Sequence, residues 1–257
     1  MSFELSVSLE YTFHEAGERL EDRMAAAAAV GLRKVEMFTT ANRDVPSLRR
    51  ALDEAGCELI SVVTDPRTRL IERDTHEGFR AMFRAAAEDA VTLGCKRLVV
   101  PSGPAVPYMK RPVQLGIVGE AMASIVPIAE ELDVTIMLEP VNTRMDHPGV
   151  LFSMTEDAVN VIEAIGSPRV RLLYDIYHSI TEGEDPFVVL PKVAHLVEHV
   201  QVADTPGRGE PGSGTVDWPA IIGLLEQVDY KGLVGAEFSP TGTDTPAALA
   251  RIRQLCA

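Results

Sequence analysis

Cysteine is scarce in this sequence, and its placement excludes several classes of protein. The three cysteines, Cys57, Cys95 and Cys256, are an odd number, are widely spaced and form no paired-cysteine metal motif. Disulfide frameworks and structural zinc sites need closely patterned cysteines, so we expect reduced thiols. The first residues also lack the basic segment, apolar run and cleavage site of a secretory signal. We therefore expect a cytoplasmic protein.

Positive charge is scarce as well. The chain carries 24 Lys and Arg against 38 Asp and Glu, for a formal net charge of −14. Nucleic-acid binding relies on clustered basic side chains that release counterions, so this balance predicts no nucleic-acid partner. No apolar run approaches the roughly 18 residues of a membrane helix, which predicts no membrane partner. We expect an enzyme of small molecules, and a homo-oligomer is compatible with the sequence.

A nucleotide-binding motif is missing from the turn where it would be expected, and a common hydrolase motif is absent. The first strand-to-helix turn has no Gly-x-Gly-x-x-Gly fingerprint, which argues against a doubly wound nucleotide-binding sheet. No serine lies in a Gly-x-Ser-x-Gly elbow, so an α/β-hydrolase triad has no support.

What the chain does contain is a regular alternation of apolar, β-branched runs with segments of helical spacing. Strands such as residues 134–138 are nearly continuous in apolar residues, as in a parallel sheet covered on both faces. The sequence therefore predicts an α/β protein, a single (β/α)8 TIM barrel with one domain over residues 1–257. The expected strands are residues 3–9, 34–37, 57–63, 97–100, 134–138, 170–174, 196–202 and 233–236.

Helices are predicted between these strands from their apolar stripes and caps. We expect Ala25 to Ala29 to pack in the core, Ser153 and Glu156 to form a capping box, and Thr245 and Asp185 to cap helices before prolines. One stripe consists of Phe79, Met82, Phe83, Ala86, Ala87, Ala90 and Val91, and another of Met154, Ala158, Val161, Ile162 and Ile165.

The last four predicted strands each carry an oxygen ligand near their carboxyl ends: Glu139, Asp175, Gln201 and Glu237. In a barrel these ends meet at the active-site face. Several carboxylates at one mouth repel each other unless a cation lies between them. An all-oxygen ligand set favours a divalent metal such as Mg²⁺ or Mn²⁺.

Further polar residues surround this predicted mouth. Arg208 is the one cationic side chain in the glycine-rich connection that follows the seventh strand, and its planar fork suits a substrate carboxylate. His178 either donates a hydrogen bond to the enediolate oxygen that develops on the substrate or orients a ligand. Glu36 ends the second strand, where it either lines the pocket or forms a salt bridge. His195 and His199 are four residues apart, but the strand that we expect to begin between them argues against a helical zinc site.

Six segments, most of them in the second half of the chain, resemble those of hydroxypyruvate isomerases, within the xylose-isomerase-like sugar isomerase and epimerase barrels. These segments are Glu139-Pro-Val-Asn142, Asp146-His-Pro-Gly149, Tyr174-Asp-Ile-Tyr-His178, Gln201-Val-Ala-Asp204, Pro206-Gly-Arg-Gly-Glu-Pro-Gly212 and Gly235-Ala-Glu237.

The resemblance implies a role for each residue at the mouth. Glutamine at position 201 favours the hydroxypyruvate isomerase branch, because the related ketose 3-epimerases typically have histidine there. The implied metal ligands are Glu139, Asp175, Gln201 and Glu237; the implied proton carriers are Glu139 and Glu237; the implied substrate contacts are His178 and Arg208.

Two positions near the expected substrate depart from the family. Residues 62–69 replace a histidine-asparagine pair and a longer loop, and Ser239 replaces a lysine. Arg67 and Arg69 are candidates for the missing charge, although neither is preferred.

The residues thus predict a metal-dependent isomerase of a small hydroxy-oxo acid that works by proton transfer through a cis-enediolate. The resemblance implies that the acid pair is hydroxypyruvate and tartronate semialdehyde. The alternatives are a ketose 3-epimerase or related oxo-sugar isomerase, a metal-dependent lyase, and a non-catalytic binding protein.

Overall fold

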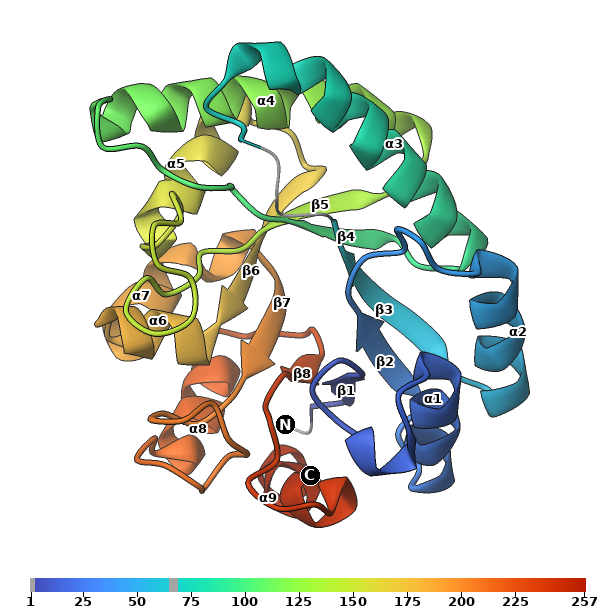
Figure 1. The fold of residues 1–257 in the computed structure, drawn as a ribbon. Helices are drawn as coiled ribbons and strands as arrows, with labels where there is room; N and C mark the ends of the chain where they lie inside the picture. Colours follow the sequence, from blue (N-terminus) through green and yellow to red (C-terminus); the bar gives the residue numbers. More distant parts are fainter. Residues whose placement is uncertain (1–2, 65–68) are drawn as a thin grey trace.

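A closed barrel of parallel strands forms the centre of the molecule (Figure 1). The structure is a computed structural model that describes residues 3–64 and 69–257. Within these residues every predicted strand is present, with bounds that differ from the prediction by no more than two residues. The strands are β1 (Leu5–Ser8), β2 (Lys34–Met37), β3 (Glu58–Val63), β4 (Arg97–Val100), β5 (Thr135–Leu138), β6 (Val170–Asp175), β7 (Val197–Val202) and β8 (Val234–Ala236).

The barrel closes because β8 pairs with both β7 and β1 in parallel. Leu5 of β1 lies opposite Val234 of β8, and Gln201 of β7 lies opposite Gly235. Closure satisfies the backbone groups of every strand and brings all the carboxyl ends to one face. The predicted (β/α)8 TIM barrel is confirmed.

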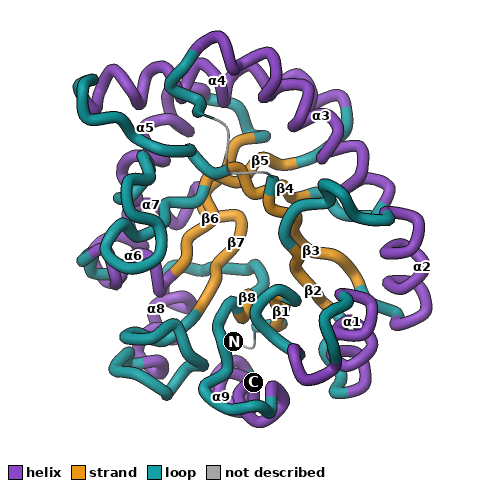
Figure 2. Tube along the Cα trace, in the orientation of Figure 1, coloured by secondary structure: helices purple, strands orange, loops and turns teal. Residues whose placement is uncertain are grey.

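Helices surround the strands on the outside of the barrel (Figure 2). Two of them, α6 and α7, lie between β6 and β7, so this crossover carries one helix more than a simple unit. The α-helices are α1 (Leu20–Ala29), α2 (Val45–Ala55), α3 (His76–Thr92), α4 (Arg111–Glu131), α5 (Thr155–Ile165), α6 (Ile176–Glu182), α7 (Pro186–Val193), α8 (Trp218–Gln227) and α9 (Thr245–Cys256).

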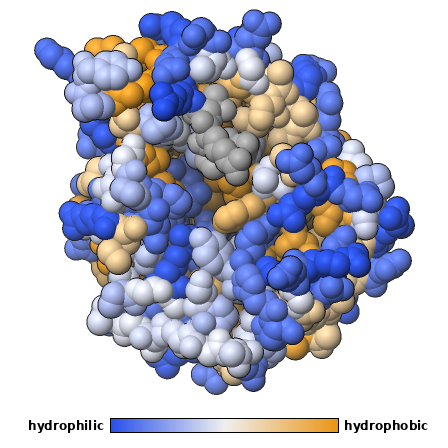
Figure 3. Space-filling view, viewed as in Figure 1, coloured by the Kyte–Doolittle hydropathy of each residue, from blue (hydrophilic) through white to orange (hydrophobic). Residues whose placement is uncertain are grey.

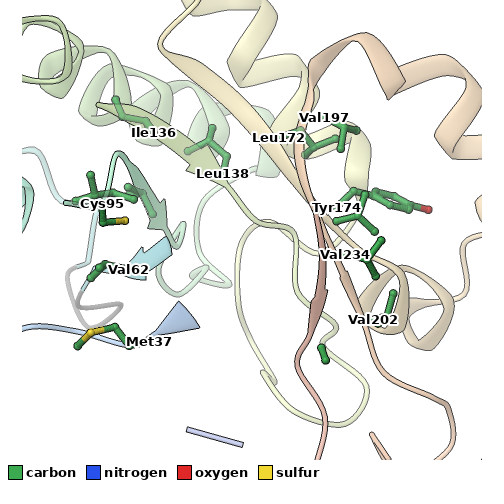
Figure 4. Packing of buried hydrophobic residues seen from close by; sticks show 14 of the residues in the cluster. Met37, Val62, Cys95, Ile136, Leu138, Leu172, Tyr174, Val197, Val202 and Val234 are labelled. Atoms are coloured by element: carbon green, nitrogen blue, oxygen red, sulfur yellow. The ribbon is translucent and has the colours of Figure 1, made fainter. Parts of the chain in front are cut away.

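Alternate strand residues divide the core into two parts. Outward-facing residues such as Ile136 and Leu138 of β5 belong to the large cluster between the strands and the helices (Figure 4). Inward-facing Val99, Met137 and Leu173 form a separate small cluster inside the barrel. The period-2 alternation of a strand explains this division, because successive side chains point to opposite faces.

Helix caps are predicted less accurately than strands. Asp185 caps α7 as expected, accepting the Phe187 amide at 2.9 Å. Asp244, one residue earlier than predicted, caps α9. The hydroxyl of Thr245 instead accepts from the Phe13 amide and donates to a carboxylate oxygen of Glu15.

The predicted capping box of α5 is also wrong by one position. The carboxylate of Asp157, rather than Glu156, accepts from the amides of Ser153 and Met154, at 3.1 and 3.0 Å. Asp157 also pairs with Arg111 of α4. Because the carboxylate joins two elements, its position is set by tertiary packing as well as by the local spacing.

Two predicted apolar stripes are narrower than expected. Phe79 and Phe83 of α3 are buried, whereas Val91 is 45% exposed, because twelve residues rotate a helix by about 120° from its starting face. Ala25 and Ala29 of α1 are exposed while Ala27 is buried, because two residues turn a helix by about 200°. The prediction that the whole run from Ala25 to Ala29 packs in the core is therefore wrong. Met154 precedes α5 and is 40% exposed.

Helix α4 is long and apolar enough to cross a membrane by length and composition, with a mean hydropathy of 1.4. This differs from the expectation that no apolar run approaches that length. Half of the most apolar 18-residue stretch of α4 is buried inside the molecule. Ile117, Val118 and Met122 are among its core residues. This burial is typical of a helix that packs on a barrel. The face of the molecule in Figure 3 is mostly hydrophilic, with separate small hydrophobic areas.

Candidate active site

Four side chains converge at the carboxyl end of the barrel. Glu139 follows β5, Asp175 ends β6, His178 lies one turn into α6 and Glu237 follows β8. One ligand atom from each lies within 4.8 Å of the others. Asp175, His178 and Glu237 are buried. Three of the four oxygen ligands predicted at the strand ends therefore lie together, and the amide nitrogen of Gln201 lies 3.3 Å from Oε1 of Glu237.

The geometry fits a cation with oxygen ligands. Asp175 uses one carboxylate oxygen, Oδ1, to accept the amides of Tyr177 and His178 at the start of α6. Its other oxygen, Oδ2, is buried and has no hydrogen-bond partner, and the same is true of the amide oxygen Oε1 of Gln201. Buried polar atoms are normally paired, so two unpaired oxygens beside Glu139 and Glu237 suit Mg²⁺ or Mn²⁺.

Burial strongly disfavours charge on these carboxylates in the absence of a cation. It raises the pKa of Glu237 to about 8, an effect opposed by Arg208 and increased by repulsion from Asp175 and Glu36. Burial, with repulsion from Glu237 and Asp175, raises the pKa of Glu139 well above its usual range. A divalent cation would offset this repulsion and favour the ionised forms.

Arg208 reaches the site from the connection between β7 and α8. Its guanidinium pairs with the Glu237 carboxylate and lies 4.0 Å from Oδ2 of Asp175. Its central carbon also lies over two aromatic rings, 4.6 Å from the ring centre of Tyr11 and 5.1 Å from that of Tyr177. Its Nε atom is buried without a partner, so one donor of the fork remains available.

Asp204 organises the connection that carries Arg208. Its Oδ1 accepts the amides of Thr205 and Val216, and its Oδ2 accepts the Gly212 amide and the indole N–H of Trp218. These bonds draw both ends of the connection onto one carboxylate. They also lower the pKa of Asp204, outweighing the opposing effect of its burial.

The connection is tightly packed and locally strained. A side chain at Gly214 would place Cβ 2.4 Å from the Thr205 carbonyl oxygen and 2.5 Å from Oδ1 of Asp204, so only glycine fits there. Arg208 itself has a left-handed backbone conformation with φ of 53°, which is uncommon for a residue with a side chain. Such strain is typical of functional loops.

His178 presents a proton to the site rather than a lone pair. The backbone amide of Asn142 donates to its Nδ1 at 3.2 Å, and the side-chain amide of Asn142 lies 2.7 Å from the same atom. Nδ1 is therefore an acceptor, so the neutral ring carries its proton on Nε2. Burial and the nearby Arg208 lower the pKa of His178 well below its usual range. Nε2 lies 3.9 Å from Glu139 and 3.7 Å from Asp175.

Glu36 contacts a histidine, the kind of pairing that was one of its two predicted alternatives. Its carboxylate is buried inside the barrel and lies 2.9 Å from Nε2 of His199. Although burial opposes its charge, interaction with His199 and hydrogen bonds from Ser6 and Gln201 lower the pKa of Glu36 to about 2.

The remaining predicted residues lie away from this cluster. His195 lies in a short 3-10 helix, Ala194–Leu196, and His199 lies in β7, which begins at Val197, so the two histidines are not on one helix. Arg69 forms an exposed pair with Glu72, and Arg67 lies outside the described residues.

Three site residues were not singled out in the sequence. Tyr11, Tyr177 and Asn142 contact Arg208 or His178. Tyr177 and Asn142 lie inside the segments that carry the resemblance, which was a usable signal. Tyr11 had no such signal, because only the closed barrel brings β1 beside β8.

Comparison with known proteins agrees with this architecture. Residues 24–255 match the family model described as xylose isomerase-like TIM barrel. The chain is 31% identical to a putative hydroxypyruvate isomerase of Homo sapiens over 265 aligned residues, covering 96% of this chain and 93% of the relative. It is 28% identical to the 2-oxo-tetronate isomerase of Cupriavidus necator, covering 93% and 92%.

The solved structure of a Brucella melitensis protein named AP endonuclease, family 2, has a TM-score of 0.90 and 25% sequence identity, with 98% of each chain covered. The predicted resemblance to hydroxypyruvate isomerases within this group of barrels is thereby confirmed. The chain belongs to the xylose isomerase-like TIM barrel family, and it is an isomerase.

Proposed function

We propose that the protein is a metal-dependent isomerase of a small hydroxy-oxo acid, with hydroxypyruvate and tartronate semialdehyde as the favoured pair. The observation that carries this proposal is the convergence of Glu139, Asp175 and Glu237 within 4.8 Å, beside an unpaired amide oxygen of Gln201. The named isomerases that align with over nine-tenths of the chain support the same class of reaction.

Glu139, Asp175, Gln201 and Glu237 would hold the metal, with Mg²⁺ or Mn²⁺ favoured by their oxygen atoms. When bound, the metal supplies a Lewis acid that polarises a substrate carbonyl and acidifies the neighbouring C–H. His178 stays outside this ligand set in our proposal, because its Nδ1 accepts the Asn142 amide and its Nε2 carries the proton.

Glu139 and Glu237 move the substrate proton. One carboxylate removes a proton from the hydroxymethyl carbon of hydroxypyruvate to give a cis-enediolate, and a carboxylic acid returns a proton to the adjacent carbon. The hydroxyl proton moves from one substrate oxygen to the other, so the product is an isomer. The Nε2–H of His178 is placed to donate a hydrogen bond to a developing oxygen.

Arg208 is the proposed contact for the substrate carboxylate. Its Nε is buried and unpaired, while the rings of Tyr11 and Tyr177 hold the guanidinium plane. A guanidinium fork matches a carboxylate, whereas an uncharged sugar has no group that requires it.

A role on abasic DNA, the activity for which the Brucella melitensis protein is named, fits this chain less well. The formal net charge of −14 opposes a polyanion. The oxygen-rich donor set is suited to Mg²⁺ or Mn²⁺ rather than to zinc.

The test is a panel of substrates assayed with Mg²⁺ or Mn²⁺ present. We expect hydroxypyruvate and related hydroxy-oxo acids to be converted with a higher kcat/KM than free ketoses. Faster turnover of free sugars would assign the protein to the ketose 3-epimerase alternative, and expulsion of a group β to the carbonyl would assign it to the lyases.

A further inference from the structure

A buried carboxylate inside the barrel, that of Glu36, accepts a hydrogen bond from the proposed metal ligand Gln201. Glu36 is 2% exposed, and all its hydrogen-bond partners are inward-facing side chains of other strands. Its Oε1 accepts from Ser6 at 2.6 Å and lies 2.9 Å from Nε2 of His199. Its Oε2 accepts from Ser61 at 3.0 Å and from Nε2 of Gln201 at 2.9 Å. Four donors around one carboxylate make it an acceptor on every side.

The barrel leaves room for this carboxylate by omitting a side chain. Gly235 of β8 lies opposite Gln201, and a Cβ added there would lie 2.3 Å from Oε1 of Glu36 and 2.7 Å from Nε2 of His199. A side chain at this position would therefore displace Glu36 and His199 and break the hydrogen bonds around the Glu36 carboxylate. Glycine at this position therefore belongs to the same arrangement as Glu36.

This network decides which end of the Gln201 amide faces the mouth. The two ends of a glutamine amide are similar in shape, but one donates and the other accepts. The nitrogen of Gln201 lies 2.9 Å from Oε2 of Glu36 and 3.3 Å from Oε1 of Glu237, both of which are acceptors. A flipped amide would direct its oxygen at two carboxylate oxygens. The amide oxygen is therefore turned away from Glu36, and it is buried without a partner.

We propose that Glu36 is a positioning residue that fixes the amide of Gln201 with its oxygen available to the metal held by Glu139, Asp175 and Glu237. This inference rests on the proposed function. Partners that orient a metal ligand commonly change metal affinity by 10- to 100-fold when they are removed.

The experiment measures the Kd for Mn²⁺ by titration calorimetry in metal-stripped protein. Glu36→Asp keeps the negative charge but withdraws the acceptor by one methylene, so we expect Mn²⁺ to bind about 10-fold more weakly or worse. Ser61→Ala is the matched control, because it removes a donor to the same carboxylate and leaves the bond to Gln201. We expect its Kd to stay within about 3-fold of the wild-type value, well below that 10-fold loss.

A double-mutant cycle separates positioning from a general effect of the charge. In the background of Gln201→Met there is no amide to orient, so Glu36→Asp is expected to leave the remaining Mn²⁺ affinity unchanged. If Glu36→Asp does not fold, as judged by circular dichroism, Glu36→Met removes the acceptor and enters the same cycle.

The outcomes distinguish this inference from the function on which it rests. The role of Glu36 would be overturned if the losses of Mn²⁺ affinity in the two single variants add in the double variant. It would also be overturned if the Glu36 variant binds Mn²⁺ as tightly as the wild type. Either result would leave the metal site intact. A wild-type protein that binds neither Mn²⁺ nor Mg²⁺ would overturn the proposed function, and the role of Glu36 with it.

Discussion

Glu139 and Glu237 are both glutamates, but their carboxylates have different neighbours. Glu237 pairs with Arg208, which opposes the rise of its pKa, whereas Glu139 lies close to two other buried carboxylates. Different environments for two carboxyl groups are what an acid and base pair requires. The proposed division of labour therefore depends on individual oxygen atoms rather than on the fold.

Glu139→Gln is expected to lower kcat by at least about 100-fold, the usual scale for a positioned acid or base. The variant should be no less stable than the wild type, because one of several mutually repelling carboxylates is removed. Steady-state assays and thermal unfolding measure the two effects. Glu120→Gln, on the exposed surface of α4 where Glu120 pairs with Arg73, is the control and should keep full activity. Unchanged turnover in Glu139→Gln would instead fit a non-catalytic binding protein.

Arg208→Lys tests recognition of the acid. Lysine keeps the positive charge but loses the planar fork and the stacking between Tyr11 and Tyr177. We expect KM for hydroxypyruvate to rise by about 10-fold or more, the scale of one lost charge-assisted hydrogen bond. Turnover of an uncharged ketose, where measurable, should change less. Equal losses for acid and sugar would mean that Arg208 acts through Glu237 and not through a substrate carboxylate.

At the scale of elements, the strands followed from the sequence and the details of the helix ends did not. Strands such as β5 were predictable because their apolar, β-branched runs are long and buried on both sides. The cap of α9 was missed because Asp244 and Thr245 are both good capping residues, and the contacts of Thr245 with Phe13 and Glu15 lie more than 200 residues away in sequence. The local spacing carries no information about such contacts.

The connection between β7 and α8 is expected to depend on Asp204. Asp204→Asn places an amide N–H₂ against one pair of donors, so we expect a loss of about 2 to 3 kcal/mol in the free energy of unfolding. Urea denaturation at pH 7 measures this loss. Arg208 should also be displaced, which would raise KM. Full stability in the variant would show that the connection is held by its other contacts.

The difference in unfolding free energy between the wild type and Asp204→Asn should depend on pH. Because the folded pKa of Asp204 is lowered, its stabilisation is complete above the unfolded pKa of about 3.9 and is lost as the pH falls through the folded value. The difference in stability between the wild type and Asp204→Asn should therefore shrink below about pH 4. A difference that stays constant down to pH 2 would contradict the assignment.

At the scale of the whole molecule, the barrel joins residues that no local pattern connects. Glu36 and Gln201 are 165 residues apart in sequence and 2.9 Å apart in space. The sequence predicted that oxygen ligands would meet at the mouth, because parallel strands bring their carboxyl ends together. The sequence left open whether Glu36 lines the pocket or forms a salt bridge. The outcome depends on the register of β8 and on the space left by Gly235.

Metal binding should stabilise the entire barrel, because the proposed ligands come from β5, β6, β7 and β8. At a Mn²⁺ concentration 100 times its Kd, linkage predicts about 2.7 kcal/mol of added stability. For a chain of this size that corresponds to a rise in Tm of roughly 5 to 10 °C. Differential scanning fluorimetry measures the shift, and it should be much smaller in Asp175→Asn. An equal shift in that variant would place the metal elsewhere.

Metal dependence is tested most directly by the kcat/KM for hydroxypyruvate in metal-stripped protein, before and after Mg²⁺ or Mn²⁺ is restored. The geometry of Glu139, Asp175, Gln201 and Glu237 predicts that activity disappears on chelation and returns with either ion. Activity that survives complete removal of divalent metal would show that these four residues do not hold a catalytic metal.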